Sequence, residues 1–206
     1  MHFWVVKPKA RLPVYMTTAR PDLAKEMGFV EAKIACPYGP SAGDEGSVLG
    51  RCMLTTAEHE YTRYGFRRLI QDKAVDILQP DVTWMGGITE ARRITAMASA
   101  YDILVIPHGS SVYSYQLQYA FTNCPVAELI NLSPQADRIT PYFGGLFLDE
   151  PLPKDGFIDL PDKPGSGVTL NREGLKRPYA RSADEVIKHY YANAEIVAPT
   201  KAHMPF

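Results

Sequence analysis

The chain has 206 residues, 46% hydrophobic and 22% charged, which provides enough apolar side chains for a folded core and excludes wholesale disorder. Its formal net charge of -1 at pH 7 gives no overall positive field that would favour nucleic acid or an anionic membrane surface. No apolar run approaches the roughly 18 residues of a transmembrane helix, so we expect no membrane association.

The cysteine content and the start of the chain indicate a cytoplasmic protein. Cys36, Cys52 and Cys124 are far apart and odd in number, a pattern that favours reduced thiols over disulfides. The apolar stretch after Met1 is short and has none of the features of a signal peptide. The arginines at 63, 67 and 68 are interpreted as one solvated helix face, with a nucleic-acid patch as the alternative.

The first fifty residues predict two strands joined by a helix. Residues 12–18 form a strand, and Pro21 opens a short helix that Gly28 closes. A second strand covers 29–36, and a loop rich in Gly, Pro and Ser follows at 37–50.

From residue 51 onward, strands and helices alternate without hairpin signals, which predicts a parallel sheet with helical crossovers. The predicted strands are 52–56, 74–78, 103–106 and 127–132, and the predicted helices are 60–71, 88–101 and 112–121. The second helix has an apolar stripe at helical spacing, formed by Ile88, Ala91, Ile94, Met97 and Tyr101.

Residues 134–180 are rich in proline and glycine and predict an irregular wrapping segment, with short strands near 145–148 and 167–170. Ser182 and Glu185 form a capping box ahead of a terminal helix at about 183–196.

Four acid–base side chains follow or lie within successive predicted strands: Glu58, Asp81, His108 and Glu128. They are separated by 23, 27 and 20 residues, compared with roughly 30 for one unit in a (β/α)8 barrel, where the chemistry gathers at the carboxyl ends of the strands. Each one alone is more simply a lone polar residue at a strand end. Four in step favour a shared active site.

The pair Asp81 and His108 fits a general base, because a carboxylate on one ring nitrogen fixes the tautomer and raises the basicity of the other. A structural histidine in a turn is the alternative. Glu58 suits a hard cation such as Mg2+. His59 beside it could bind substrate, or it could be a surface histidine.

Two other patterns near these residues are weaker. Ser110 and Ser111 lie close to His108 and suggest a Ser–His–Asp hydrolase as an alternative, but no G-x-S-x-G elbow is present. Gly86 and Gly87 could let the backbone approach a ligand, although a plain βα turn is the favoured interpretation.

Several long stretches resemble the L-rhamnonate dehydratase family of the mandelate racemase subgroup, in the enolase superfamily. They are 19–29 (ARPDLAKEMGF), 79–87 (QPDVTWMGG), 105–114 (VIPHGSSVYS), 121–128 (FTNCPVAE), 162–173 and 175–179. The resemblance implies a (β/α)8 TIM-type barrel, a sugar-acid substrate and frequent homo-oligomers. It divides the chain into an unassigned segment at 1–11, a barrel domain at 12–133 and a wrapping segment with a terminal helix at 134–206.

The resemblance also implies roles for the four residues. Glu58 matches a Mg2+ carboxylate. Asp81 and His108 match the catalytic dyad, in which His108 removes the proton next to the substrate carboxylate and then assists the loss of water. Glu128 matches the glutamate that hydrogen-bonds the enediolate, and the product is a 2-keto-3-deoxy sugar acid. Lys33 stands where related subgroups keep a lysine base and receives no firm role.

The pattern departs from the family in two places. The N-terminal capping domain and the third and fourth βα units, which carry the other two metal carboxylates, have no match, and the surroundings of Asp44 and Glu45 do not resemble those ligands. We therefore predict a partial barrel with open sheet edges and a chain that is inactive by itself. The alternatives are a non-catalytic relic or binding scaffold, or a related acid-sugar dehydratase or racemase.

Overall fold

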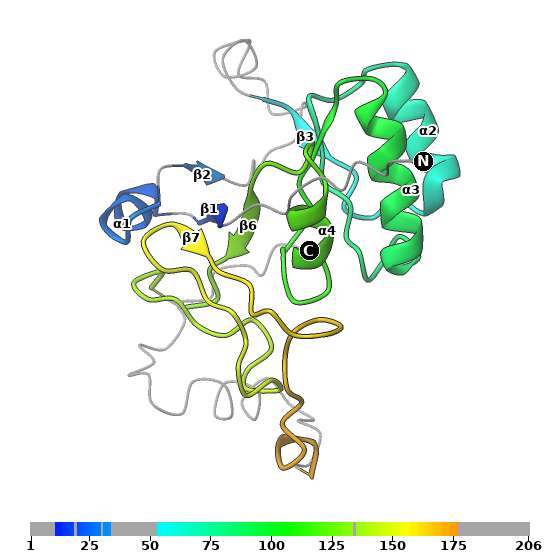
Figure 1. Ribbon diagram of the computed structural model, residues 1–206. Coiled ribbons are helices and arrows are strands. Elements are labelled where there is room, and N and C mark those ends of the chain that lie inside the picture. Colours follow the sequence, from blue (N-terminus) through cyan, green and yellow to red (C-terminus); the bar gives the residue numbers. More distant parts are fainter. Residues whose placement is uncertain (1–10, 19, 30, 34–52, 134, 177–206) are drawn as a thin grey trace, which may run out of the picture.

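The computed structural model describes residues 11–18, 20–29, 31–33, 53–133 and 135–176 (Figure 1). The elements in chain order are β1 (Leu12–Thr17), α1 (Pro21–Glu26), β2 (Ala32–Lys33), β3 (Thr55–Thr56), α2 (Thr62–Gln71), β4 (Ile77–Leu78), α3 (Gly87–Ser99), β5 (Leu104–Val105), α4 (Tyr115–Ala120), β6 (Ala127–Ile130), β7 (Phe157–Ile158) and a 3-10 turn at Gly174–Lys176. The predicted alternation of strand and helix is confirmed, with shorter elements than expected. None of the helices in these ranges is long and apolar enough to cross a membrane.

Two parallel sheets carry the alternating part of the chain. In one, β1 lies between β2 and β6, with Thr17 opposite Lys33 on one side and Ile130 on the other. In the other, β4 lies between β3 and β5. The first strand of the series pairs with the last, as it does when a series of strands closes into a barrel. The predicted α/β partial barrel is therefore confirmed, and β2, β3, β5 and β6 are edge strands among the residues described.

Each sheet has its own apolar core. Helices α2 and α3 cover the β3–β4–β5 sheet (Figure 1), and Phe66 and Ile70 of α2 and Ile94 of α3 are completely buried. Around β1 and β6, a second core contains Leu12, Met16 and the rings of Tyr115 and Tyr119 from α4. Burial of one such large apolar side chain contributes about 1.5–3 kcal/mol, so both helix layers are fixed to their sheets.

Two details of the predicted helices are wrong. Ile88 is 44% exposed, and Ala98 instead joins Ala91 and Ile94 on the buried face of α3. Helix α4 begins three residues later than expected, because a turn precedes it in which the backbone N–H of Ser111 donates to the hydroxyl of Ser114. Before α3, Gly86 has a left-handed backbone with φ of 117° at the N-cap, which agrees with a plain βα turn.

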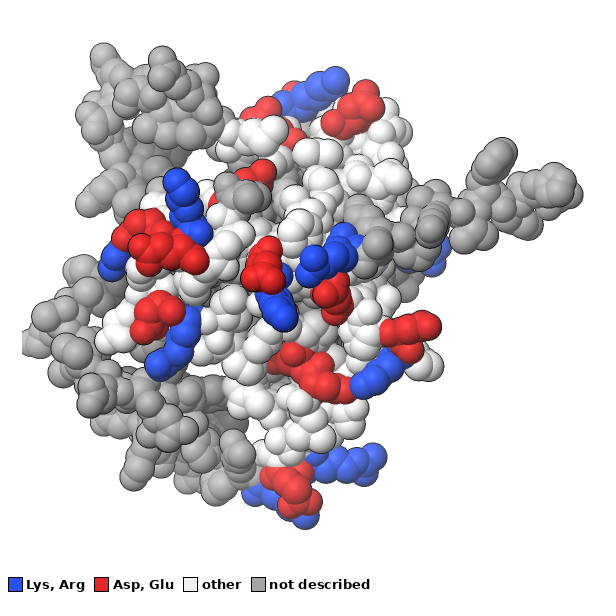
Figure 2. Space-filling view, turned by 60° about the vertical axis from the view of Figure 1, so that its left-hand side comes forward, with Lys and Arg blue, Asp and Glu red and all other residues white. Residues whose placement is uncertain are grey.

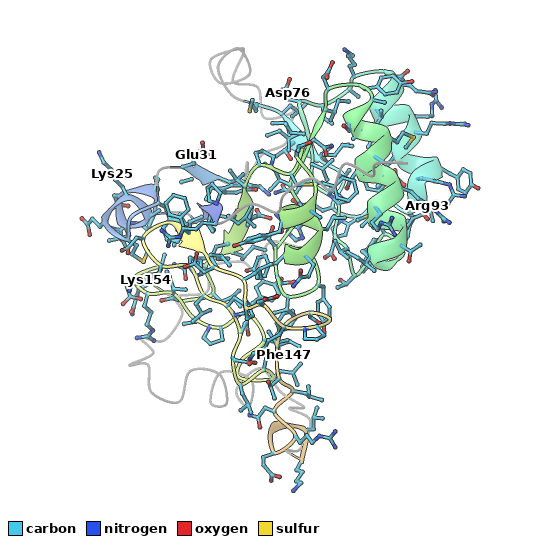
Figure 3. All side chains as sticks on the ribbon, in the orientation of Figure 1. Lys25, Glu31, Asp76, Arg93, Phe147 and Lys154 are labelled. Carbon is cyan, nitrogen blue, oxygen red and sulfur yellow. The ribbon has the colours of Figure 1, made fainter. Side chains whose placement is uncertain are left out.

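The segment after β6 wraps against the barrel (Figure 1). Strand β7, which the sequence did not predict, pairs antiparallel with the start of β1. The two predicted short strands reduce to one bridge between Phe147, labelled in the lower part of Figure 3, and Leu170. Asp149 holds this region by accepting hydrogen bonds from Lys163 and Thr169, which lower the pKa of Asp149 to about 2. The expected terminal helix and almost all of the 1–11 segment lie outside the described residues.

The arginines of α2 do not form a uniformly solvated face. The carboxylate of Glu90, in α3, accepts bonds from the backbone N–H of Arg63 at 2.9 Å and from its guanidinium at 2.8 and 3.0 Å, and Arg93 adds a further bond at 3.0 Å. Glu90 therefore satisfies an N–H in the first turn of α2, which its own N-cap residue does not cap. On the face in Figure 2, acidic and basic side chains are interspersed and do not separate by sign.

Replacement of Glu90 by glutamine should weaken the acid sensitivity of the fold. The hydrogen bond from the Arg63 backbone, followed by the guanidinium groups, lowers the pKa of Glu90 to about 2. A lowered pKa means that the contribution to stability is complete above the ordinary pKa near 4.5 and is lost as the pH falls towards 2. The melting temperature of Glu90→Gln should fall less than that of the wild type between pH 4.5 and 2. The exposed carboxylate variant Glu173→Gln is the control and should follow the wild type.

Candidate active site

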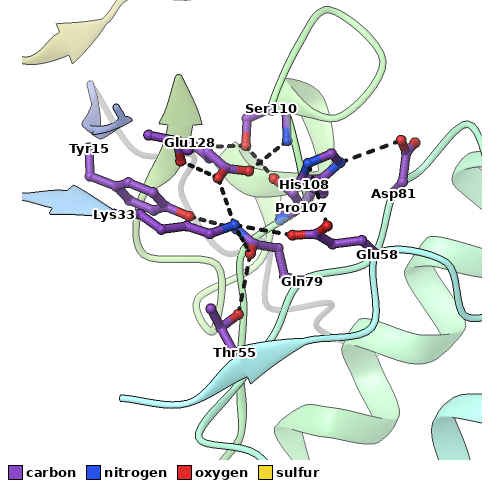
Figure 4. A network of polar contacts seen from close by, with 12 residues as sticks. Tyr15, Lys33, Thr55, Glu58, Gln79, Asp81, Pro107, His108, Ser110 and Glu128 are labelled. Atoms are coloured by element: carbon purple, nitrogen blue, oxygen red, sulfur yellow. Dashed lines mark hydrogen bonds and ion pairs between the residues drawn. The ribbon is translucent and has the colours of Figure 1, made fainter. Parts of the chain in front are cut away.

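The four acid–base residues predicted from strand spacing come together at one edge of the two sheets. Glu58 follows β3, Asp81 follows β4, His108 follows β5 and Glu128 lies within β6. Figure 4 shows their side chains converging from these four elements. Because the carboxyl ends of parallel strands face the same side, the sequence spacing was sufficient to predict this meeting point.

His108 lies between two carboxylates. Its Nδ1 is 3.7 Å from Oδ2 of Asp81, and its Nε2 is 3.8 Å from Oε2 of Glu58. Both distances exceed that of a hydrogen bond, although catalytic contacts are often long before substrate binds. The three side chains are between 27% and 33% exposed, so a ligand in solvent can reach them.

The orientation of Asp81 is fixed by its own turn. Its Oδ1 accepts bonds of 2.7 Å from both the backbone N–H and the hydroxyl of Thr83, which leaves Oδ2 directed at His108. On the other side, Ala57 precedes Glu58 with φ of 90°, an unfavourable backbone for a residue with a side chain. Strained conformations of this kind cluster at functional sites, and here the strain lies directly before the carboxylate that faces the imidazole.

Glu128 is the buried centre of the network. One of its oxygens accepts from the hydroxyl of Thr17 and, at 3.1 Å, from Nζ of Lys33. The other accepts from the backbone N–H of Gly109 at 2.7 Å. The side chain is completely inaccessible to solvent, so these donors replace the water that an ionised carboxylate would otherwise need.

Lys33 is the residue whose importance the sequence did not reveal. From the end of β2, its Nζ donates to Gln79 at 2.6 Å, to Glu58 at 3.1 Å and to Glu128 at 3.1 Å. Gln79 is fully buried and donates in turn to the hydroxyl of Tyr15 at 2.6 Å. The available signal was a set of polar residues inside otherwise apolar strand runs. The hydrogen-bond partners of these polar residues cannot be identified until the strands are placed side by side.

Two tyrosines near the network remain protonated at neutral pH. Burial, reinforced by the negative charge of Glu128, raises the pKa of Tyr15 well above its usual range. Burial also raises the pKa of Tyr142, with contributions from Asp81 and Glu128. Tyr142 lines a small cavity of about 60 Å³ beside His108 and Asp81, together with Thr83. This cavity has room for a few waters and lies well below the roughly 300–1,000 Å³ of pockets that bind small molecules.

A family model described as "Enolase C-terminal domain-like" matches residues 47–174, which is more than half of the chain. The chain belongs to this family. An L-rhamnonate dehydratase from Saccharopolyspora erythraea is 36% identical over an alignment of 235 residues that covers 82% of this chain and 60% of that protein. The chain therefore spans less than two thirds of this relative's length.

Solved structures give the same relationship for this enolase-family chain. L-rhamnonate dehydratase from Gibberella zeae has a TM-score of 0.73 at 31% identity, with 83% of this chain and 63% of that one covered. The same enzyme complexed with Mg has a TM-score of 0.71 at 32% identity, covering 81% and 58%. L-talarate dehydratase from Polaromonas sp. JS666, complexed with Mg and L-glucarate, has a TM-score of 0.51 at 25% identity, covering 60% and 32%.

The comparison supports the predicted internal gap. The alignment to the Saccharopolyspora enzyme is 235 residues long, which exceeds the 206 residues of this chain. It therefore includes positions where the relative has residues and this enolase-family chain has none. That the gap falls after β2 remains a prediction, as do Asp44 and Glu45 as non-ligands, because residues 34–52 lie outside the described part.

The described side chains do not fit a magnesium ion. Mg2+ requires near-octahedral oxygen ligands at about 2.0–2.1 Å. One oxygen of Glu58 accepts from the ammonium of Lys33, and the other faces His108. Within the described ranges, no group of three His, Cys, Asp or Glu side chains is arranged to hold a metal ion.

Of the remaining predicted residues, His59 lies outside the network, whereas the hydroxyl of Ser110 joins it by accepting from the backbone N–H of Glu128 at 3.0 Å (Figure 4). His59 is exposed and packs edge-on against Trp84, with ring centroids 5.3 Å apart, so its role towards substrate remains a prediction. Ser110 is buried, with its hydroxyl donating to the carbonyl of Pro107 and accepting from Gln118. A serine bonded in this way is not activated by His108, which argues against the hydrolase alternative.

Proposed function

We propose that this site is the acid–base half of an acid-sugar dehydratase that acts on L-rhamnonate. The observation that carries the proposal is His108 held between Asp81 and Glu58 at the mouth of a barrel of the enolase family. His108 takes the proton from the carbon next to the substrate carboxylate, and Asp81 orients the ring and stabilises the imidazolium that forms. The imidazolium then donates its proton to the departing hydroxyl, which leaves as water and yields 2-keto-3-deoxy-L-rhamnonate.

We further propose that the chain does not complete this reaction by itself. Proton removal next to a carboxylate leaves an enediolate with two negative charges. The one cation that contacts Glu58 and Glu128 in the described residues, Lys33, already gives its three donors to protein oxygens. Cytoplasmic location, homo-oligomer formation and the role of Glu128 towards the intermediate remain predictions.

The purified chain is therefore expected to give no 2-keto-3-deoxy-L-rhamnonate when incubated with L-rhamnonate and Mg2+. Calorimetric titration with Mg2+ and then L-rhamnonate, alongside His108→Asn, checks whether either binds. Turnover that His108→Asn abolishes would contradict the predicted inactivity while supporting the role of His108.

A non-catalytic binding scaffold is a second candidate, and a specific observation favours it. Glu58 and Glu128 already form ion pairs with Lys33 inside the protein, as in a structural ion network. The two candidates differ in what residues 53–133 can do when the rest of a dehydratase is supplied. A related sugar acid is the third candidate, and the likeness to L-talarate dehydratase makes L-glucarate the substrate to test beside L-rhamnonate.

A further inference from the structure

We propose that Lys33 is the resident cation of this site and occupies the position that a divalent cation would need. Three oxygens converge on its Nζ: Oε1 of Gln79 at 2.6 Å, Oε1 of Glu58 at 3.1 Å and Oε1 of Glu128 at 3.1 Å. An ammonium group has three N–H donors, so Lys33 is saturated by these acceptors. Figure 4 shows all three side chains pointing at Nζ.

The charge of Glu128 makes a cation at this place necessary. Its side chain is fully buried, and a buried carboxylate without a compensating charge is strongly unfavourable. Within the described residues, Lys33 is the cationic side chain that forms an ion pair with it. The register of β1 and β2 places Lys33 opposite Thr17, whose hydroxyl donates to the carboxylate of Glu128. Strand pairing therefore positions the ammonium beside this carboxylate.

The converging atoms are themselves the ligand type of a hard cation. Two carboxylate oxygens and one amide carbonyl oxygen are groups that Ca2+ and Mg2+ accept. These oxygens lie 2.6–3.1 Å from Nζ, compared with about 2.3–2.6 Å around Ca2+ and about 2.0–2.1 Å around Mg2+. A substitution that removes the ammonium but keeps the three oxygens should leave a site that binds Ca2+ more tightly than Mg2+.

The test compares the melting temperatures of the wild type and Lys33→Met in EDTA, Ca2+ and Mg2+. The wild type should be insensitive to both ions. In EDTA, Lys33→Met should melt at a lower temperature than the wild type. We expect a dissociation constant for Ca2+ of about 1 mM, and Ca2+ at about ten times that concentration should raise the melting temperature of Lys33→Met by about 3–6 °C. Mg2+ at the same concentration should raise it less. Lys33→Met combined with Glu58→Gln should lose most of this response. Lys163→Met, which breaks the ion pair with Asp149 far along the chain, is the matched control and should show no response.

A folded Lys33→Met that responds to neither ion would overturn the proposal. Stoichiometric Mg2+ or Ca2+ binding by the wild type that disappears in Glu58→Gln would also overturn it, because the ion would then hold Glu58 despite the lysine. If Lys33→Met folds only when Ca2+ is present, the proposal is supported. If it folds in no condition, calorimetry on the wild type decides, and an absence of divalent binding there supports the proposal. These readouts do not depend on L-rhamnonate, so they stand apart from the proposed function.

Discussion

Replacement of the matching segment of the Gibberella zeae L-rhamnonate dehydratase by residues 53–133 of this chain is expected to leave an enzyme that still dehydrates L-rhamnonate. The segment carries Glu58, Asp81, His108 and Glu128 together with the apolar core beneath α2 and α3, so it moves as a packed unit. The host, which is known in complex with Mg, supplies the rest of its own barrel. This arrangement tests the acid–base half with the rest of the site supplied by the host.

In that chimera, His108→Asn should lower kcat by about 10²- to 10⁴-fold, the range for loss of a general acid or base. Arg93→Gln, which changes a 56% exposed side chain on the outside of α3, is the control and should leave kcat within a few-fold. A folded chimera that binds L-rhamnonate but turns over no faster than its His108→Asn form would reject the dehydratase proposal in favour of the scaffold. Retained turnover that depends on His108 would reject the scaffold.

The acid–base residues could be predicted from sequence because their meeting depends only on local order. Each follows or lies in a short apolar run, and alternation of strand and helix forces such runs to lie parallel. Asp81 and His108 come from adjacent strands, β4 and β5, which pair at Leu78 and Val105. Their approach to 3.7 Å therefore follows from strand order without any knowledge of the wider fold.

Lys33 could not be assigned a role in this way, because its partners are distant in the sequence. Gln79 and Glu128 lie 46 and 95 residues away from it, and they reach Lys33 from the other sheet and from across β1. The same reason explains why β7 was missed. Its two residues have no periodicity of their own, and the pairing with Leu12 and Pro13 depends on how the wrapping segment folds back.

Helix starts were also misjudged, because side chains outside the helix determine them. The first turn of α2 is satisfied by Glu90 from α3, 27 residues further along the chain from Arg63. Sequence capping rules consider only the residues next to the helix. The apolar pattern therefore predicts the start of a helix to within one turn, and contacts with other elements determine the residue at which it begins.

Glu128→Ala is expected to destabilise the fold by about 3 kcal/mol, near the lower end of the range for breaking a buried ion pair. The substitution removes the acceptor for Lys33, Thr17 and the buried backbone N–H of Gly109. Lys33 keeps Glu58 and is 21% exposed, which places the cost at the lower end. For a chain of this size, the melting temperature should fall by about 6–12 °C, measured alongside urea unfolding at pH 7.

Glu58→Ala is the matched comparison, because it removes the other carboxylate that contacts the same ammonium. Glu58 is 33% exposed, whereas the Glu128 side chain is fully buried, so solvent should limit its cost to about 1 kcal/mol or less. Glu128 contacts β1, β2 and the turn after β5, and it therefore joins the two sheets on the side where β5 and β6 do not pair. If Glu58→Ala were as destabilising as Glu128→Ala, the ammonium of Lys33, and not the buried carboxylate, would be the group that holds the sheets together. A clear excess for Glu128→Ala would mean that the buried carboxylate holds the sheets together.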